Sequence, residues 1–254
     1  MTERTRKLQH CLATLVAAAP LLATTLLTVT PSHAAVAREA TAATHAAPPA
    51  RRHPAQQDTV VGETVDAINT TTRFWDWYMP RFTGSQFRRP GLGAWGYGRN
   101  SIYNRDTTVL KCGTNTLGKN NAYACTGGAN NWVAFEVHLM NKAARLGDAF
   151  IWVIVAHEYA HVVQRQLASR YLSQAYELQA DCFAGATMGE MYRRGMLILE
   201  RGDYQEIDDS LAEVAGLPWG SGGTHGSVAQ RWSAFGTGWR GGNPACLNYV
   251  PIPG

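Results

Sequence analysis

The stretch "VAHEYAHVVQ" at residues 155–164 places His157 and His161 four positions apart, with Glu158 directly after the first histidine. Residues four apart on an α-helix lie on the same face, about one turn from each other. The surrounding run, residues 147–170, is largely apolar and has no Gly or Pro after its first residue, which predicts a mostly buried helix. Three titratable side chains inside such a helix indicate a specific chemical role.

The spacing is that of the HExxH motif, in which two histidines of one helix bind zinc. A catalytic zinc site uses three protein ligands at about 2.0–2.2 Å and keeps one position open. His157 and His161 can supply two ligands, and Glu158 lies where a general base acting on a water molecule is needed. The alternative is a helix with two core histidines and a chance glutamate.

A third ligand is available in the next predicted helix, residues 173–195, for which Ser173 is a candidate cap. Glu177 and Asp181 are four apart and share one face of this otherwise apolar stretch. Burying two carboxylates is costly unless positive charge meets them. One carboxylate can bind Zn²⁺ while the other accepts the free ring N–H of a ligand histidine. A solvated helix face carrying two acids is the alternative.

The N-terminus has the features of an export signal. A basic opening, an apolar run and small residues before Ala34 or Ala37 predict a signal peptide over residues 1–34, with an uncleaved membrane anchor as the alternative. Residues 35–58 are rich in Ala, Pro and Arg and predict a disordered linker or pro-segment. Residues 59–254 then form one domain, secreted and without a stable membrane anchor after cleavage.

Cysteine usage agrees with export. Four cysteines lie in the predicted domain, and four allow three pairings. Cys112 and Cys125 flank a turn-rich loop and are close in sequence, so we pair them, which leaves Cys182 with Cys246. Cys182 follows Asp181 and therefore points about 100° away around the helix, which argues against a role as a zinc ligand.

The order of the remaining elements predicts a mainly helical α+β domain with a small sheet. We expect an amphipathic helix over residues 60–82 and a strand over 131–139 with one buried face. Helices follow over 203–216, opening with Asp203 and Glu206 in capping-box spacing, and over 224–239, starting near Ser227. Asp148 is the expected N-cap of the HExxH helix.

Two other patterns carry less weight. The "GLGAWG" at residues 91–96 matches a dinucleotide fingerprint, but Pro90 precedes it and no helix pattern follows, so we reject it. The formal net charge of +4 arises partly from basic residues before the domain, and the domain has no basic stripe. Nucleic-acid binding is therefore not expected. The open face of the 132–138 strand is a candidate surface for an extended peptide.

The stretches "GDAFIWVIVAHEYAHVVQ", "ELQADCFAG" and "HGSVAQRWSAFGTGW", followed by a late Cys, resemble the bacterial putative neutral zinc metallopeptidase family. The resemblance covers roughly residues 60–246, and the "ELQAD" block is also similar to that of the CAAX-type prenyl proteases. It implies a zincin-like fold, Glu177 as the third ligand and Asp181 as the partner of a ligand histidine. Ala160 and Val162 depart from the family pattern, but neither change removes a ligand.

These observations predict a secreted zinc peptidase that acts on a peptide or protein, with Glu158 as general base. His225, in a Gly-rich loop, is the candidate donor to the oxyanion, and a helix-capping or surface histidine is the equal alternative. Tyr159 and Tyr176 are weaker candidates. The competing class is a non-catalytic extracellular binding protein of the same fold, stabilised by zinc. The presence of Glu158 favours the enzyme. The sequence does not define the oligomeric state.

Overall fold

The computed structural model describes residues 56–91, 101–127, 131–173, 175–214, 218–219 and 223–253. The predicted signal peptide, most of the predicted linker and nearly all of the "GLGAWG" segment lie outside these residues. The helices within them are α1 (Gln56–Thr83), α2 (Val137–Leu146), α3 (Asp148–Gln164), η2 (Ser169–Tyr171), α4 (Tyr176–Arg193), α5 (Asp203–Glu213), α6 (Val228–Gly241) and η3 (Asn243–Cys246). The strands are β1 (Ile102–Tyr103), β2 (Lys111–Cys112), β3 (Asn115–Thr116), β4 (Ala122–Cys125), β5 (Trp132–Glu136), β6 (Pro218–Trp219) and β7 (Gly223–Thr224). The predicted α+β class, mainly helical with a small sheet, is confirmed.

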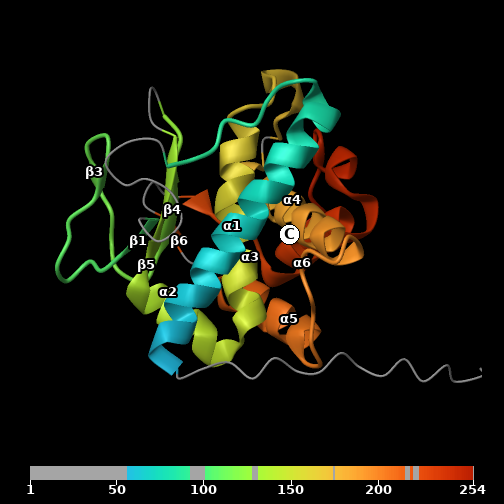
Figure 1. Ribbon diagram of the computed structural model, residues 1–254. Coiled ribbons are helices and arrows are strands. Elements are labelled where there is room, and N and C mark those ends of the chain that lie inside the picture. Colours follow the sequence, from blue (N-terminus) through green and yellow to red (C-terminus); the bar gives the residue numbers. More distant parts are fainter. Residues whose placement is uncertain are drawn as a thin grey trace, which may run out of the picture. The chain divides into compact units, whose positions relative to one another are not determined.

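The sheet lies to one side of the helices and has the strand order β1-β5-β4 (Figure 1). The central strand β5 pairs in parallel with β1 and antiparallel with β4. The prediction of a strand over 131–139 is wrong in two respects. The strand ends at Glu136, whose side chain accepts a hydrogen bond from the backbone of His138 and caps α2. All five residues of β5 are also buried, so β5 has no open face for a peptide.

Helix α3 carries the HExxH motif through the centre of the helical part (Figure 1). It packs against α1, α2, α4 and α5 and against strands β4 and β5. Its apolar residues are buried all around, as expected for a helix inside a core. The hydroxyls of Thr72 on α1 and Tyr159 on α3 lie 2.7 Å apart, which satisfies both polar groups inside this core.

The ends of α3 differ from the sequence prediction. The helix stops at Gln164 instead of continuing to 170. Its N-cap is Gly147, and the expected cap Asp148 is already the first helical residue. A carboxylate from another helix takes over the capping role, because Glu206 on α5 accepts a hydrogen bond from the backbone N–H of Ala149 at 3.2 Å. Glu206 thus ties α5 to the start of α3.

The N-caps predicted for α4 and α5 are wrong, and the one predicted for α6 is confirmed. Helix α5 begins after Gly202, so the expected capping box of Asp203 with Glu206 is wrong. Helix α4 begins at Tyr176, and Ser173 does not cap it. Helix α6 has the predicted cap, since Ser227 and Gln230 form a complete capping box.

Helices α4 and α6 approach each other closely because glycines lie at their contact. A Cβ atom on Gly185 of α4 would lie 2.1 Å from the backbone oxygen of Phe235. A Cβ atom on Gly238 of α6 would lie 1.8 Å from the backbone oxygen of Cys182. Only glycine allows the two backbones to approach this closely. The contact fixes α6 against the helix that carries Glu177 and Asp181.

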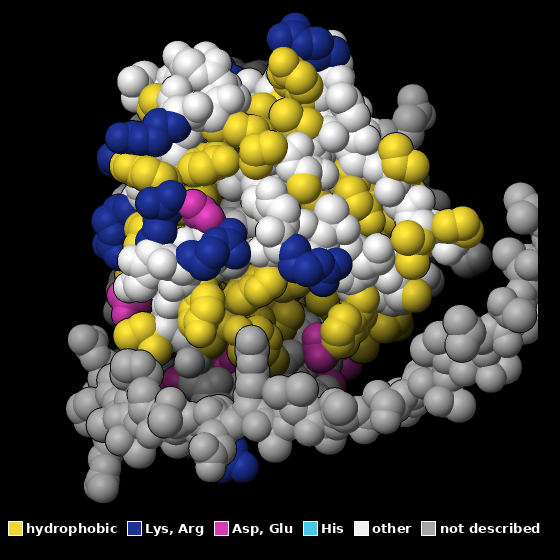
Figure 2. Space-filling view, turned by 90° about the vertical axis from the view of Figure 1, so that its right-hand side faces the viewer, with side chains coloured by type: hydrophobic (Ala, Val, Ile, Leu, Met, Phe, Trp, Pro, Cys, Tyr) yellow, Lys and Arg dark blue, Asp and Glu magenta, His cyan; other side chains and the backbone are white. Residues whose placement is uncertain are grey.

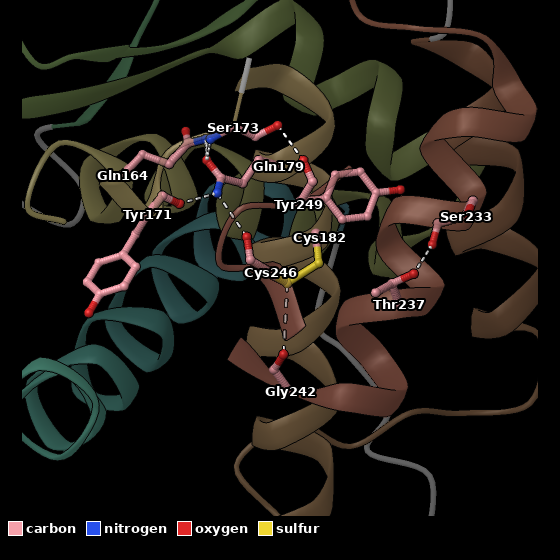
Figure 3. The surroundings of a disulfide bond; sticks show 10 residues. All are labelled: Gln164, Tyr171, Ser173, Gln179, Cys182, Ser233, Thr237, Gly242, Cys246 and Tyr249. Atoms are coloured by element: carbon pink, nitrogen blue, oxygen red, sulfur yellow. Dashed lines mark hydrogen bonds between the residues drawn. A yellow bond between two sulfur atoms is a disulfide. The ribbon is translucent and has the colours of Figure 1, made fainter. Parts of the chain in front are cut away.

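Both predicted disulfides are present. Cys112 bonds with Cys125 and Cys182 bonds with Cys246, with Cα–Cα distances of 5.7 and 5.6 Å. The first closes the loop between β2 and β4. The second joins α4 to η3 beside the amide of Gln179, as Figure 3 shows. Two disulfides are consistent with an extracellular protein.

The surface carries large hydrophobic side chains as well as charges. Exposed examples on α4, α5, α6 and the segments around them are Tyr192, Ile198, Tyr204, Val228, Trp232, Val250 and Ile252. Figure 2 shows hydrophobic patches with Lys and Arg side chains between them. Among the described residues, no helix combines the length and apolar character that crossing a bilayer requires.

Candidate metal centre

Two helices bring three potential ligands to one point. His157 and His161 project from α3, and Glu177 projects from the first turn of α4. The Nε2 atoms of His157 and His161 lie 3.3 and 3.5 Å from Oε2 of Glu177. One ligand atom from each of the three residues lies within 4.8 Å of the other two. The structure therefore assembles the three residues that the sequence analysis selected as ligands.

These separations suit a zinc ion. With zinc–ligand bonds of about 2.0–2.2 Å, two ligand atoms of a tetrahedral site lie about 3.3–3.6 Å apart. Oε2 of Glu177 is buried and makes no hydrogen bond of standard geometry within the described part of the chain. Its neighbours are imidazole nitrogens instead. Two imidazoles and one carboxylate around an otherwise unsatisfied oxygen are a donor set that fits Zn²⁺.

The second ring nitrogen of each histidine meets an oxygen. Nδ1 of His157 lies 2.9 Å from Oδ1 of Asp181, and Nδ1 of His161 lies 2.9 Å from Oε1 of Gln164. An acceptor at Nδ1 places the ring proton there and leaves the lone pair of Nε2 facing Glu177. Both rings thus have the tautomer that a metal ligand needs.

The electrostatics also favour positive charge between these groups. Burial by itself would lower the pKa of His157, but Asp181 and Glu177 raise it to about 10. Burial by itself would raise the pKa of Glu177, but the imidazoles of His157, His161 and His225 bring it well below its usual value. The site stabilises a cation, either a proton or a metal ion, at the point where the three side chains meet.

The sequence analysis missed two residues that support the site. Arg231 on α6 is buried and binds both oxygens of Asp181, with N–O distances of 2.7 and 2.5 Å. Gln164 holds His161 and in turn donates to Gln179 at 3.0 Å. Gln164 lies on the same helix face as His161, so its spacing was a usable signal. Arg231 is far from Asp181 in sequence. The sequence indicated only that a buried carboxylate requires a cation as partner, and not which residue supplies it.

The pKa of Asp181 reflects these contacts. Burial would raise it, but the charge of Arg231 and the hydrogen bond with His157 hold the pKa below its usual value. Asp181 therefore stays ionised and can accept the ring N–H of His157.

Glu158 lies beside the three candidate ligands and is almost fully buried, with 3% of its surface exposed. Together with His157 and His225 it lines a cavity of about 270 Å³. Burial raises the pKa of Glu158, while the charges of His161 and His157 and the backbone of Ala124 act in the opposite direction. A carboxyl group with a raised pKa beside a candidate metal site is suited to accept a proton and to return it.

His225 belongs to the site. It is 3% exposed, and its Nδ1 atom lies 3.1 Å from Oε2 of Glu177. The alternative of a surface or helix-capping histidine is wrong, since Ser227 caps α6. Tyr176 stacks on the ring of His161 with centroids 5.2 Å apart. The hydroxyl of Tyr159 is bonded to Thr72, which argues against a role for it at the site.

Comparison with known proteins identifies the family of this chain. The model of the family described as "Putative neutral zinc metallopeptidase" matches residues 11–249. Two proteins named Uncharacterized protein YpfJ, from Escherichia coli K12 and Escherichia coli O6:H1, are each 32% identical over 141 residues, or 46% of this chain. The chain spans about half the length of these relatives, with 48% of each covered. No solved structure matches the chain. The chain belongs to the putative neutral zinc metallopeptidase family.

Proposed function

We propose that this protein is a secreted zinc-dependent peptidase. One observation carries the proposal: His157, His161 and Glu177 bring ligand atoms within 4.8 Å of one another, directly beside the buried carboxylate of Glu158. A site built only for structural zinc is closed by a fourth protein ligand. Here the described residues supply three ligands, a neighbouring acid and a cavity.

The chemistry divides between the metal and the chain. Bound zinc would act as a Lewis acid toward a carbonyl oxygen and lower the pKa of a water molecule toward about 7. Glu158 takes a proton from that water and later delivers it to the amine that leaves. Its burial supports this role, because a raised pKa makes this carboxylate a better proton acceptor than an exposed glutamate.

His225 is the proposed donor to the negative charge that develops on the carbonyl oxygen. Nδ1 of His225 faces the carboxylate of Glu177 and directs its N–H toward it, so a second N–H directed at the substrate requires the imidazolium form of the ring. The residue also lines the cavity next to Glu158. A donor fixed in advance stabilises such a charge without reorganisation during the reaction. The burial of His225 supports a fixed position.

A peptide backbone has a candidate binding edge on β4. Asn121 bonds to β5 through its backbone oxygen, so in the antiparallel ladder Ala122 and Ala124 direct their backbone groups away from β5. This outer edge lies toward α3, because the backbone N–H of Ala124 bonds to Glu158. The backbone N–H of Ala122 bonds to Oδ1 of Asn121, so a peptide would use the carbonyl oxygens of Ala122 and Ala124 as acceptors. Strand addition at β4 replaces the predicted binding on the face of the 132–138 strand.

The test combines metal analysis with digestion. Secreted protein should contain one zinc ion per chain and cleave casein or a peptide library. A chelator should abolish the cleavage, and added Zn²⁺ should restore it. Zinc at full occupancy with no hydrolysis of any peptide would instead support the binding-protein alternative. N-terminal sequencing of the secreted material tests cleavage after Ala34 or Ala37.

A further inference from the structure

The cavity beside Glu158 is lined by both apolar and polar side chains. The apolar ones include Leu139, Phe150, Val153, Ile154 and Val214. The polar ones include Glu158, His225 and Arg231. At about 270 Å³ it lies just below the usual range for small-molecule sites, about 300–1,000 Å³. This volume suits one apolar side chain and the backbone next to it better than a large ligand.

One guanidinium nitrogen of Arg231 takes no part in the hydrogen bonds to Asp181. Nε and Nη2 donate to the two oxygens of Asp181. Nη1 is buried and has no hydrogen-bond partner among the described residues. A buried donor without an acceptor costs about 1–3 kcal/mol, so such a group calls for an explanation. Because Arg231 lines the cavity, a bound molecule can supply the missing acceptor.

The charges around Arg231 select the kind of acceptor. Asp181 already balances the charge of the guanidinium through two hydrogen bonds. Glu158 lines the same cavity and would repel a second carboxylate, while Lys119, which also lines it, is already paired with Asp106. A neutral carbonyl oxygen accepts from Nη1 without that repulsion. The acceptor is therefore a peptide or amide carbonyl, and a free C-terminal carboxylate is disfavoured.

We propose that the cavity binds the substrate residue that supplies the leaving amine, and that Nη1 of Arg231 donates to the backbone carbonyl of that residue. The inference rests on the proposed peptidase function, because Glu158, which returns the proton to the leaving amine, lines the same cavity. The residue has a medium-sized apolar side chain such as Leu. The bond that is cut is internal to the substrate chain.

The first test compares matched substrates on the zinc-loaded wild-type protein. Two substrates carry Leu after the scissile bond, one ending in a carboxamide and the other in a free carboxylate. In the third, 3-methylbutylamine replaces Leu, so that the side chain is kept and the carbonyl is absent. The carboxamide substrate should have a kcat/KM at least about 10-fold above the other two, the size expected for one charge-assisted hydrogen bond. Equal values, or a preference for the carboxylate, would overturn the proposal.

Arg231→Lys separates binding of the substrate from support of Asp181. Lys keeps a positive charge near Asp181 but lacks the planar fork that serves two acceptors. The variant should retain zinc and lose the discrimination between the carboxamide and the amine substrates. A variant that is slower on both substrates by the same factor would show that Arg231 only positions Asp181. Circular dichroism and zinc stoichiometry confirm that the variant is folded and loaded.

Equilibrium binding distinguishes failure of this inference from failure of the proposed function. The probe is Leu-Ala-amide, which resembles the product with the free amine, measured by calorimetry against wild type and Arg231→Lys. Wild type should bind it about 10-fold more tightly, whether or not any peptide is cleaved. Cleavage without this difference overturns the inference alone. Selective binding without cleavage overturns the peptidase function and leaves the assignment of Arg231 intact.

Discussion

Nδ1 of His157 lies 2.9 Å from Oδ1 of Asp181, so a side chain on α4 orients an imidazole ring on α3. Arg231 on α6 holds both oxygens of the same carboxylate. Three helices that are separate in sequence therefore set the direction of one imidazole ring. Since α4 and α6 meet at Gly185 and Gly238, the packing of these helices and the geometry of the site depend on each other.

Replacing Glu158 by Gln should leave zinc in place and remove activity. Glu158 is near the candidate ligands but does not belong to the group of three residues whose ligand atoms converge. Gln has a similar shape and cannot accept the proton, and general acid–base groups typically contribute about 10²–10⁴-fold in rate. Zinc stoichiometry and kcat/KM on one peptide measure the two effects. A variant that hydrolyses the peptide at nearly the wild-type rate would exclude Glu158 as the base.

Glu177 and Asp181 should differ in their effect on zinc retention. Glu177 faces both histidine Nε2 atoms, whereas Asp181 contacts Nδ1 of His157. Glu177→Ala removes a ligand and should purify nearly free of zinc. Asp181→Ala removes an orienting group, and such losses cost about 10–100-fold in affinity or activity. Zinc stoichiometry after dialysis against a weak chelator compares them. The reverse order would make Asp181 the ligand.

Gln164 should support His161 as Asp181 supports His157. Its oxygen accepts from Nδ1 of His161, and its amide is fixed by Tyr176 and Gln179. Gln164→Ala frees the ring, so zinc affinity should fall about 10–100-fold. Gln166→Ala is the matched control, because Gln166 bonds to the backbone of residue 88 on an exposed surface. Equal zinc affinity in the two variants would show that Gln164 does not contribute to zinc binding.

The residues that share one helix were predictable, and the contacts between helices were not. His157, Glu158 and His161 follow from helical spacing alone, and so does the shared face of Glu177 and Asp181. The sequence could not decide which histidine meets Asp181, because that depends on how α3 packs on α4. The cation that neutralises Asp181 was missed for the same reason.

The strand prediction failed at a residue whose side chain has a capping role. Hydrophobic alternation continues to Leu139, and alternation was the only signal used. Glu136 ends the strand because its carboxylate accepts from the backbone of His138 and begins α2. The prediction of Asp148 as the N-cap of α3 is also wrong, since the N-cap is Gly147 and Glu206 from a distant helix accepts from the backbone of Ala149. Local sequence patterns do not contain this long-range hydrogen bond.

The two disulfides should differ in their effect on the zinc site. Cys182–Cys246 spans 64 residues, and in the chain-entropy model its loss costs about 4 kcal/mol of unfolding free energy. Gln179 bonds both to the backbone of Cys246 and to Gln164, so this bridge is linked to His161 (Figure 3).

Removing this bridge by a Cys182→Ala, Cys246→Ala double substitution should therefore lower both stability and zinc affinity. The matching double substitution at Cys112 and Cys125, which are 13 residues apart, should cost about 3 kcal/mol and leave zinc affinity nearly unchanged. Urea unfolding and zinc titration measure the two quantities. Peptide mapping without reductant must first recover both bridges from secreted protein, since free thiols there would refute the pairing.

Glu136 should make stability depend on pH in the acid range. Its carboxylate is fully buried and accepts from the backbone N–H groups of Arg105, Asn120 and His138 and contacts the ring of His138. Burial would raise the pKa of Glu136, but these hydrogen bonds lower it below the usual 4.5. The ionised form is therefore favoured in the folded protein. Its stabilisation is complete above about pH 4.5 and is lost as the pH falls through the lowered pKa.

Glu136→Gln should reduce the unfolding free energy at pH 7 by about 1.5–3 kcal/mol, the size of a hydrogen bond to a charged group. The difference from wild type should shrink as the pH falls below 4.5, because wild type then also loses the charge. Glu213→Gln is the control, since Glu213 forms an exposed ion pair with Lys142 that is worth about 0–1 kcal/mol. Urea unfolding from pH 3 to 7 gives the curves. Parallel curves for wild type and Glu136→Gln would show that Glu136 does not control acid stability. Convergence would establish that the ionised form of Glu136, which accepts from the backbone of Asn120, stabilises the fold above about pH 4.5.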